Sequence, residues 1–338
     1  MKQSWLKPAL FSFGFAILGS ILILFASALT ANRYIEPETG TLANGASSIV
    51  DDSAANGGAV LFQAPIVGAQ PVWQDTFDAT LDMTTQSHTG VWRPNDFWQN
   101  INRGYRDFAG TSWNLNPNET PGHNPFTISD GVLRITSKRT PAELNSVIQA
   151  SMVAQEQYGS VPAWAGGMLI TNKDVRTFSN GYYEFRVRFP NVGKGMFPAL
   201  WFYSADGNLN PGKEGAEIDL LEIFGHQDGS IVNSGMHFLA SNNVQVRNHF
   251  SGSVTGDTMG WHTYALDWQA TYLRFYKDDV MYAEATGEDA AWFNGIQMGI
   301  RMNYAMDASW FGANASNGTT PNPLYMDIDY VKYYNQKP

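Results

Sequence analysis

The chain has 338 residues, 43% of them hydrophobic, which is enough to bury a sizeable core in one large β domain or two small domains. Its formal net charge of −10 argues against nucleic acid or an anionic membrane surface as the main partner. The sequence contains no cysteine, which excludes disulfides, thiolate catalysis and cysteine-ligated zinc.

Residues 1–31 have the pattern of an export segment. Lys2 and Lys7 precede an uncharged, mainly apolar run over residues 8–29, and Ala26 to Ala28 form an acceptable small-residue cleavage site. The run is also long enough to span a bilayer. We therefore expect an exported protein that is either secreted after cleavage or anchored at the cell surface, with membrane attachment through residues 8–29 only.

Residues 32–70 are rich in Gly, Ala, Ser and Asn, a composition that predicts a linker. Within this segment, residues 36–42 and 50–60 resemble the opening strands of a carbohydrate-binding β-sandwich. The segment is too short to close such a sandwich. It is therefore either a linker with the remnant of a carbohydrate-binding module or a strand pair that packs on the main domain.

From residue 71 to 338, strand signals recur and predict one all-β domain. Asp130-Gly131 lies between two alternating runs and predicts a hairpin turn. Thr140 to Glu143 has the pattern of a capping box and predicts a short helix after it. Further strands are predicted where apolar and polar residues alternate, over residues 182–189, 264–268, 273–275 and 325–334.

The most informative stretch is Glu217-Ile218-Asp219-Leu220-Leu221-Glu222. Its aliphatic residues predict a buried strand, in which Glu217 and Asp219 share one face. A β-bulge near Leu220 and Leu221 would return Glu222 to that same face. Three neighbouring carboxylates raise one another's pKa, so that one acid stays protonated while another ionises near neutral pH. Glycosidases need one protonated and one ionised acid of this kind. The alternative interpretation is that the three acids simply form the solvated face of a strand.

The pattern E-x-D-x-x-E, with Pro198 to Trp201 upstream, resembles the bulged branch of glycoside hydrolase family 16, which includes laminarinases and other endo-β-1,3(4)-glucanases. The likeness extends over most of residues 71–335. It includes segments 178–188, 195–201 (with Phe197 where Trp is usual), 261–268, 273–279 (with Asp279 where Gly is usual) and 329–334. The resemblance implies a β-jelly-roll sandwich of two curved antiparallel sheets with a concave substrate cleft. It also implies Glu217 as nucleophile, Glu222 as general acid/base and Asp219 as the carboxylate between them.

The same resemblance implies which residues bind substrate. Trp201 matches a sugar-stacking position, although a core role is nearly as plausible for a tryptophan, and His237 matches a position beside the acid/base. Asn303 and Trp310 match a late cleft segment whose usual glycine pair is replaced here by Asp307-Ala308. Further candidates in the cleft's non-reducing arm are Trp92, Trp98, Arg103 and Trp113. Many members carry a structural calcium, for which Asp329 is the matching ligand, and no cofactor is implied for catalysis.

We therefore expect a retaining, endo-acting hydrolase of a β-linked polysaccharide, with β-1,3- or β-1,3(4)-glucan as the first substrate candidate. Depolymerisation of a bacterial exopolysaccharide or a galactan is the alternative within the same class. A non-catalytic glycan-binding jelly roll is the alternative from another class. Transglycosylation also stays open, since sugar as well as water can capture a covalent glycosyl intermediate.

Overall fold

A computed structural model describes residues 46–50, 58–62, 69–83, 89–95, 102–107, 111–204, 208–213, 215–227, 229–239 and 246–338. The chain divides into two compact units, residues 1–70 and 71–338. In the first unit, β1 (Ala46–Val50) pairs antiparallel with β2 (Gly58–Phe62). No helix among the described residues is long and apolar enough to cross a membrane, and the apolar run of residues 8–29 lies outside the described residues.

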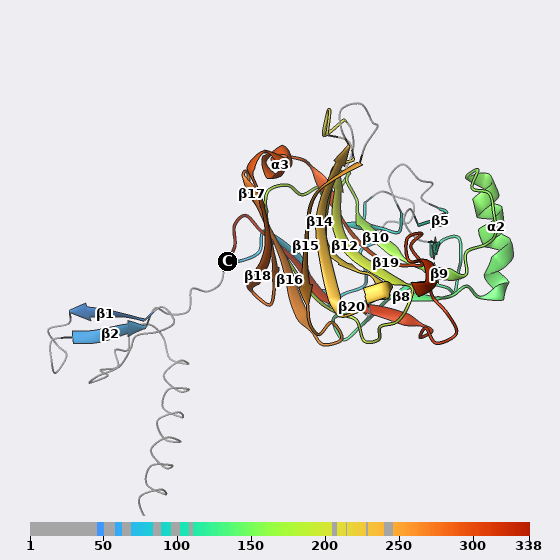
Figure 1. The fold of residues 1–338 in the computed structure, drawn as a ribbon, viewed down its shortest axis with the longest axis horizontal. Helices are drawn as coiled ribbons and strands as arrows, with labels where there is room; N and C mark the ends of the chain where they lie inside the picture. Colours follow the sequence, from blue (N-terminus) through green and yellow to red (C-terminus); the bar gives the residue numbers. More distant parts are fainter. Residues whose placement is uncertain are drawn as a thin grey trace, which may run out of the picture. The chain divides into compact units, whose positions relative to one another are not determined.

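The second unit is built on two sheets (Figure 1). In the first, every neighbouring pair of described strands is antiparallel. Its order is β15 (Val246–Thr255), β14 (Ile231–Leu239), β13 (Glu217–Ile223), β12 (Met196–Ser204), β19 (Met298–Met306), β10 (Met168–Thr171) and β4 (Trp92–Arg93).

The second sheet is also antiparallel, apart from one parallel pair, β6 with β9. Its order is β18 (Val280–Thr286), β17 (Tyr272–Lys277), β16 (His262–Trp268), β11 (Gly181–Arg188), β20 (Leu324–Tyr334), β8 (Val132–Arg139), β9 (Trp164–Gly166), β6 (Trp113–Asn114) and β5 (Tyr105–Arg106). Strand β3 (Trp73–Asp75) pairs with β20, and β7 (Phe126–Ser129) pairs with β8. The predicted all-β sandwich is confirmed.

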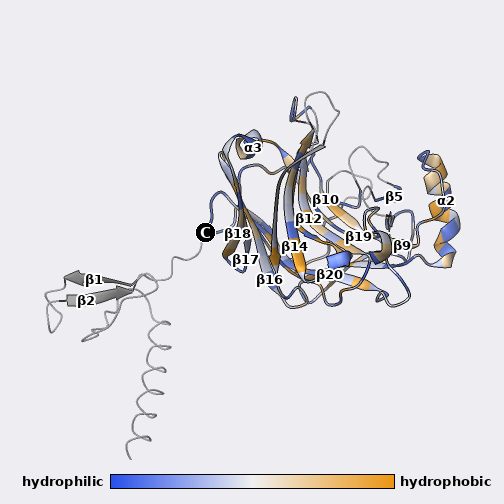
Figure 2. Cartoon of the chain, viewed as in Figure 1, coloured by the Kyte–Doolittle hydropathy of each residue, from blue (hydrophilic) through white to orange (hydrophobic). Residues whose placement is uncertain are grey.

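The core lies between the two sheets because the strands alternate in burial. In β11, Tyr183, Phe185 and Val187 are fully buried, and the rings of Tyr183 and Phe202 of β12 meet edge to face with centroids 4.8 Å apart. Burial of apolar surface, to which such rings contribute, is the main favourable contribution to folding. Figure 2 shows the resulting pattern, with hydrophobic and hydrophilic residues mixed along the strands of the second unit.

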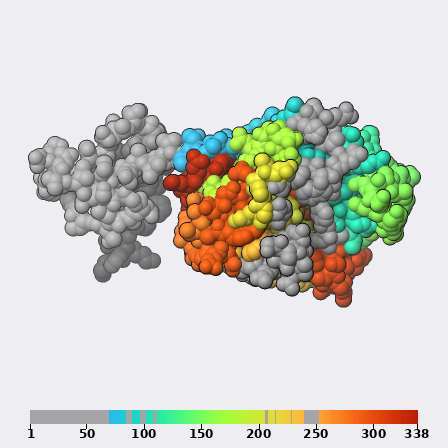
Figure 3. All heavy atoms as spheres, turned by 90° about the horizontal axis from the view of Figure 1, so that it is seen from above, coloured from blue at the N-terminus to red at the C-terminus, as the bar shows by residue number. Residues whose placement is uncertain are grey.

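The helices lie outside the sheets. The 3-10 helix η1 (Ala142–Leu144) leads into α2 (Asn145–Ala154), and α3 (Gly287–Trp292) follows β18. Figure 3 shows the green residues that include α2 at one end of the second unit and the orange residues that include β16–β18 toward its other end. The predicted helix is present, but the predicted capping box is wrong, since the Thr140 hydroxyl donates to the Pro162 carbonyl at 2.6 Å instead. The predicted hairpin turn at Asp130-Gly131 is confirmed, with φ of 53° and 71°.

Candidate active site

Strand β13 carries a bulge at the predicted place. Its register with β12 shifts between Leu200 and Trp201. Leu200 lies opposite Leu221, whereas the next residue, Trp201, lies opposite Asp219, so Leu220 is skipped. Leu220 is therefore the extra residue, and both leucines of β13 face the core with no exposed surface. The bulge turns Glu222 to the face that Glu217 and Asp219 already share.

The three acids line one pocket of about 320 Å³. Strands β12, β13 and β19 supply most of its wall, and Met168 of β10 and Asp107 complete it. The lining residues are Asp107, Met168, Phe197, Ala199, Trp201, Tyr203, Glu217, Asp219, Glu222, Arg301 and Asn303. An apolar and aromatic wall with a few convergent polar groups is typical of a ligand site.

Burial and mutual repulsion disfavour charge on these acids. Burial first, and then repulsion by Asp219, raises the pKa of Glu217 to about 8, while the positive charges of His237 and Arg301 act in the opposite direction. Burial, followed by repulsion from Asp219 and Glu217, raises the pKa of Glu222 well above its usual value, and His237 opposes that rise. The charge of Arg301 opposes the rise in the pKa of Glu217 in addition to that of His237, so the electrostatic surroundings of the two glutamates differ.

His237 of β14 lies opposite Glu217 across the strand pair. Its Nε2 atom is 2.9 Å from Oδ2 of Asp219, which is itself nearly fully buried. Side-chain ligand atoms of Glu217, Asp219 and His237 all lie within 4.8 Å of one another. Together with Glu222, these polar side chains of β13 and β14 therefore form one electrostatic unit.

Besides the three acids, two sequence-predicted residues line the pocket, and His237 is not among the lining residues. Trp201 is partly buried and its Nε1 donates to Oδ1 of Asn303 at 2.8 Å. Asn303 lies opposite Ala199 in the β12–β19 register, and Ala199 in turn lies opposite Glu222, so Asn303 is at the level of Glu222. Trp310 does not line the pocket; it is 53% exposed and meets Phe197, which does, edge to face at 5.4 Å.

The structure corrects the expectation for Trp92 and Trp113. Both have no exposed surface. Trp92 packs in the main core and donates from Nε1 to Asp75 at 2.7 Å, and Trp113 packs with the residues of α2. An indole that is enclosed on all sides has no face to offer a sugar ring. Arg103 lies outside the pocket lining with its guanidinium 3.7 Å from Glu119, and Trp98 lies outside the described residues.

Sequence reasoning missed Arg301, Tyr203 and Asp107 as members of the pocket. Arg301 is two residues before Asn303, and Tyr203 is two residues after Trp201. Alternate residues of a strand share a face, so this spacing was the available signal. Asp107 lies outside the strands, and its place beside the acids has no comparable signal in the sequence.

The calcium expectation rests on Asp329 of β20. Its Oδ2 atom is 2.6 Å from Nη1 of Arg186, so a guanidinium already neutralises this carboxylate and would repel a cation. Among the described residues, the one cluster of acids and histidines close enough to share an ion is that of Glu217, Asp219 and His237, not one around Asp329. The side chains at Asp329 therefore do not fit a calcium ion, and calcium plays no part in the mechanism below.

Comparisons with known proteins identify the family of the chain. A sequence model of glycosyl hydrolases family 16 matches residues 122–332. The endo-1,3-1,4-beta-glycanase ExsH of Rhizobium meliloti (strain 1021) is 31% identical over 252 residues, which cover 73% of this chain and 48% of that protein. The glucan endo-1,3-beta-glucosidase A1 of Niallia circulans is 26% identical over 297 residues, covering 80% of this chain and 39% of that protein. The chain thus spans less than half of the length of these two curated relatives.

Solved structures show the fold. The laminarinase from Flavobacterium sp. UMI-01 superposes with a TM-score of 0.55 at 19% identity, covering 78% of this chain and all (100%) of that one. SCLam, a non-specific endo-beta-1,3(4)-glucanase, gives a TM-score of 0.57 at 21% identity over 80% of this chain and 96% of that one. At such identities the likeness bears on the fold and not on the substrate. The expected jelly-roll architecture is confirmed.

Proposed function

The chain belongs to glycosyl hydrolase family 16, and from that membership and the acids of β13 we propose that it is a retaining, endo-acting hydrolase of a β-linked polysaccharide. The observation that carries the proposal is the bulge at Leu220, because it brings three carboxylates into one pocket beside Trp201 and Asn303. A lone run of acids on a solvated strand would need neither the bulge nor the burial.

The proposed reaction has two steps. Ionised Glu217 attacks the anomeric carbon while protonated Glu222 donates its proton to the leaving oxygen, which gives a covalent glycosyl-enzyme. Glu222, now a base, takes a proton from water, and the water oxygen displaces Glu217 from the anomeric carbon. Asp219 repels negative charge on both glutamates, which favours keeping the proton on Glu222 once Glu217 has ionised.

For the substrate we propose β-1,3- or β-1,3(4)-glucan. This choice follows the names of the relatives from Rhizobium meliloti and Niallia circulans, which describe a 1,3-1,4-beta-glycanase and a glucan 1,3-beta-glucosidase. A relative from Sphingobacterium multivorum, 26% identical over 235 residues, is named as a keratan-sulfate endo-1,4-beta-galactosidase. Galactans and bacterial exopolysaccharides therefore stay as the second candidates.

The test is reducing-sugar release by the purified full chain on laminarin, lichenan, agarose, carrageenan and succinoglycan. A Glu217→Gln variant serves as the matched control, since it keeps the shape of the side chain and removes its charge. Turnover of laminarin or lichenan that the variant lacks supports the proposal. Nuclear magnetic resonance of the first product tests the stereochemistry: retention is expected, and inversion would rule out Glu217 as a nucleophile.

The same variant separates the alternatives. A hydrolase with Glu217→Gln loses turnover and keeps its affinity for the glycan, whereas a non-catalytic binding protein has no turnover to lose. Longer products that form when oligosaccharide is added in excess would indicate transglycosylation. Turnover confined to agarose, carrageenan or succinoglycan would move the substrate to the second candidates while leaving the mechanism in place.

Export is part of the proposal. Residues 8–29 would deliver the remainder of the chain outside the cell, as a secreted protein after cleavage or as a membrane-attached one without it. N-terminal sequencing of the protein recovered from medium and from membranes decides between these two forms. Recovery of an uncleaved chain from the cytoplasm alone would contradict both.

A further inference from the structure

Arg301 lines the pocket and is held there by two aromatic rings. It sits on β19 directly opposite Trp201 of β12, and only 1% of its surface is exposed. Its Cζ atom lies 4.6 Å from the ring centroid of Trp201 and 4.4 Å from that of Tyr203. The two rings meet edge to face with an interplanar angle of 80°, so they form a corner around the guanidinium. Such contacts fix both the place and the plane of a buried cation.

Among the described residues that line the pocket, Arg301 supplies the one permanent positive charge, against the carboxylates of Asp107, Glu217, Asp219 and Glu222. A guanidinium keeps its charge throughout the pH range in which proteins are stable. It therefore offers a constant attraction to nearby carboxylates, and this attraction is strong because Arg301 itself is almost fully buried.

This attraction is unequal for the two glutamates. The charge of Arg301 lowers the pKa of Glu217, whereas the charges that act on the pKa of Glu222 are those of Asp219, Glu217 and His237. The β12–β13 register agrees with that difference. Glu217 lies opposite Tyr203, one of the two rings that hold Arg301, whereas Glu222 lies opposite Ala199, which is farther along β12. A retaining pair needs one acid ionised and the other protonated, and unequal surroundings are what separate them.

We propose that Arg301 is a positioning residue, whose charge selects Glu217 rather than Glu222 as the ionised acid and whose stacked guanidinium supports Trp201 on the pocket wall. This inference rests on the proposed function and names the side chain that makes Glu217 the ionised acid and leaves Glu222 protonated. The alternative is that Arg301 only fills the space between Trp201 and Tyr203. The two accounts differ in whether the charge or merely the volume of the side chain matters.

The first experiment follows the glutamates directly and needs no substrate. Carbon-13 nuclear magnetic resonance of side-chain carboxyls would be recorded against pH, with the signals of Glu217 and Glu222 identified by their loss in the Gln variants. In Arg301→Met, the titration midpoint of Glu217 is expected to rise by about one pH unit or more, with a smaller change at Glu222. Arg139→Met is the matched control, because Arg139 also stacks on an indole, that of Trp164 at 4.3 Å, but outside the pocket lining.

A second variant separates charge from stacking. Arg301→Lys keeps the charge and removes the planar group, so Glu217 is expected to titrate within about half a unit of the wild-type protein. On whichever polysaccharide is turned over, this variant should raise KM several-fold, because Trp201 loses its support, and change kcat little. Arg301→Met should instead lower kcat/KM about tenfold on the acid side of the profile, where one pH unit corresponds to a factor of ten.

An unchanged Glu217 midpoint in folded Arg301→Met, or an equal rise at both glutamates, would overturn the proposal. If the Met variant does not fold, a Glu217 midpoint displaced by more than about one unit in Arg301→Lys would overturn it as well. If the wild-type protein releases no reducing sugar from any of the polysaccharides but Glu217 and Glu222 titrate as expected, the proposed substrates are rejected and the role of Arg301 is supported.

Discussion

Nε2 of His237 lies 2.9 Å from Oδ2 of Asp219, and the two residues are held on neighbouring strands, β14 and β13. This contact places a titratable cation beside the central acid of the pocket. The charge of His237 lowers the pKa of both Glu217 and Glu222, whereas that of Arg301 affects Glu217. His237 therefore lowers the pH range in which both glutamates titrate, against the larger effects of burial and of Asp219.

We predict that His237→Gln moves both limbs of the kcat/KM profile to higher pH. Without the imidazole, both glutamates hold their protons more strongly, so activity on the acid side falls about tenfold for each unit of displacement. The profile is measured by reducing-sugar release from the preferred polysaccharide. His123→Gln is the control, because His123 pairs with Glu143 at 3.8 Å and is not among the charges that act on the two pocket glutamates. Loss of activity at all pH values by one constant factor would show that His237 only supports the structure.

How far the sequence predicts this site depends on the kind of residue. The bulge could be predicted because Leu220 and Leu221 are adjacent aliphatics between acids, and only an extra residue lets both face the core while the acids share a face. That inference uses local periodicity alone. It needs no knowledge of which strands are neighbours.

The aromatic residues could not be assigned in the same way. A tryptophan suits a core and a sugar-binding wall equally well, and only the packing of distant segments decides, as in the burial of Trp113 against α2. The spacing of Arg301 from Asn303 could place it on the same strand face, but only the β12–β19 register shows that it lies opposite Trp201. Contacts between strands so far apart in the sequence leave no pattern in either strand.

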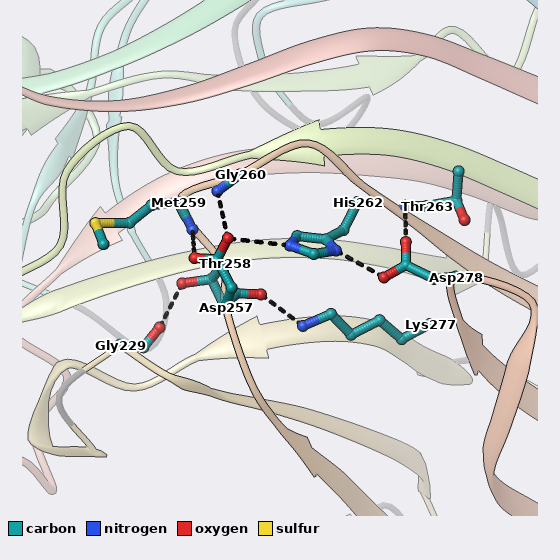
Figure 4. A network of polar contacts seen from close by, with 9 residues as sticks. All are labelled: Gly229, Asp257, Thr258, Met259, Gly260, His262, Thr263, Lys277 and Asp278. Atoms are coloured by element: carbon teal, nitrogen blue, oxygen red, sulfur yellow. Dashed lines mark hydrogen bonds and ion pairs between the residues drawn. The ribbon is translucent and has the colours of Figure 1, made fainter. Parts of the chain in front are cut away.

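The hairpin between β17 and β18 offers a test of stability. Asp278 and Asp279 both have positive φ, 49° and 62°, as a two-residue turn of the primed type requires. Asp278 is held in this conformation by hydrogen bonds from the Thr263 amide at 3.0 Å and with the His262 ring at 2.7 Å (Figure 4). Among the contacts of the described residues, no such bond is made by the exposed Asp279 side chain.

We therefore predict that Asp279→Gly stabilises the protein by about 0.5 kcal/mol, because glycine adopts positive φ without steric cost. Asp278→Gly should destabilise it by about 1 kcal/mol or more, because it removes both bonds shown in Figure 4. Thermal unfolding of the two variants beside the wild-type protein provides the measurement. Destabilisation by Asp279→Gly would mean that backbone conformation does not limit the stability of this turn, and stabilisation by Asp278→Gly would mean that the two hydrogen bonds do not.

Calcium removal is expected to leave the protein unchanged. Asp329, the residue that the family resemblance suggests as a ligand, is bonded to Arg186, so the carboxylate has no need of a metal. Dialysis against a chelator should shift the melting temperature by less than about 1 °C and preserve activity. A fall of several degrees that added CaCl₂ reverses, and that Asp329→Asn abolishes, would instead place a calcium ion at this end of β20.

The raised pKa of Glu217 also predicts how stability depends on pH. The folded-state pKa, about 8, exceeds the ordinary value of 4.5, so the folded chain holds this proton more tightly than the unfolded chain does. The resulting stability is fully present below about pH 4.5 and is lost progressively as the pH rises to about 8. Glutamine stays neutral throughout, so Glu217→Gln avoids this loss.

We predict that the melting temperature of Glu217→Gln exceeds that of the wild-type protein by several degrees at pH 8 and hardly at all at pH 4.5, while kcat falls by about three orders of magnitude or more. Thermal unfolding at a series of pH values across this range tests the first part, and reducing-sugar release tests the second. Glu288→Gln, at an exposed acid of α3, controls for the change in net charge. A stability gain that is the same at every pH would show that burial does not hold the proton on Glu217, and the division of roles between Glu217 and Glu222 would then need another cause.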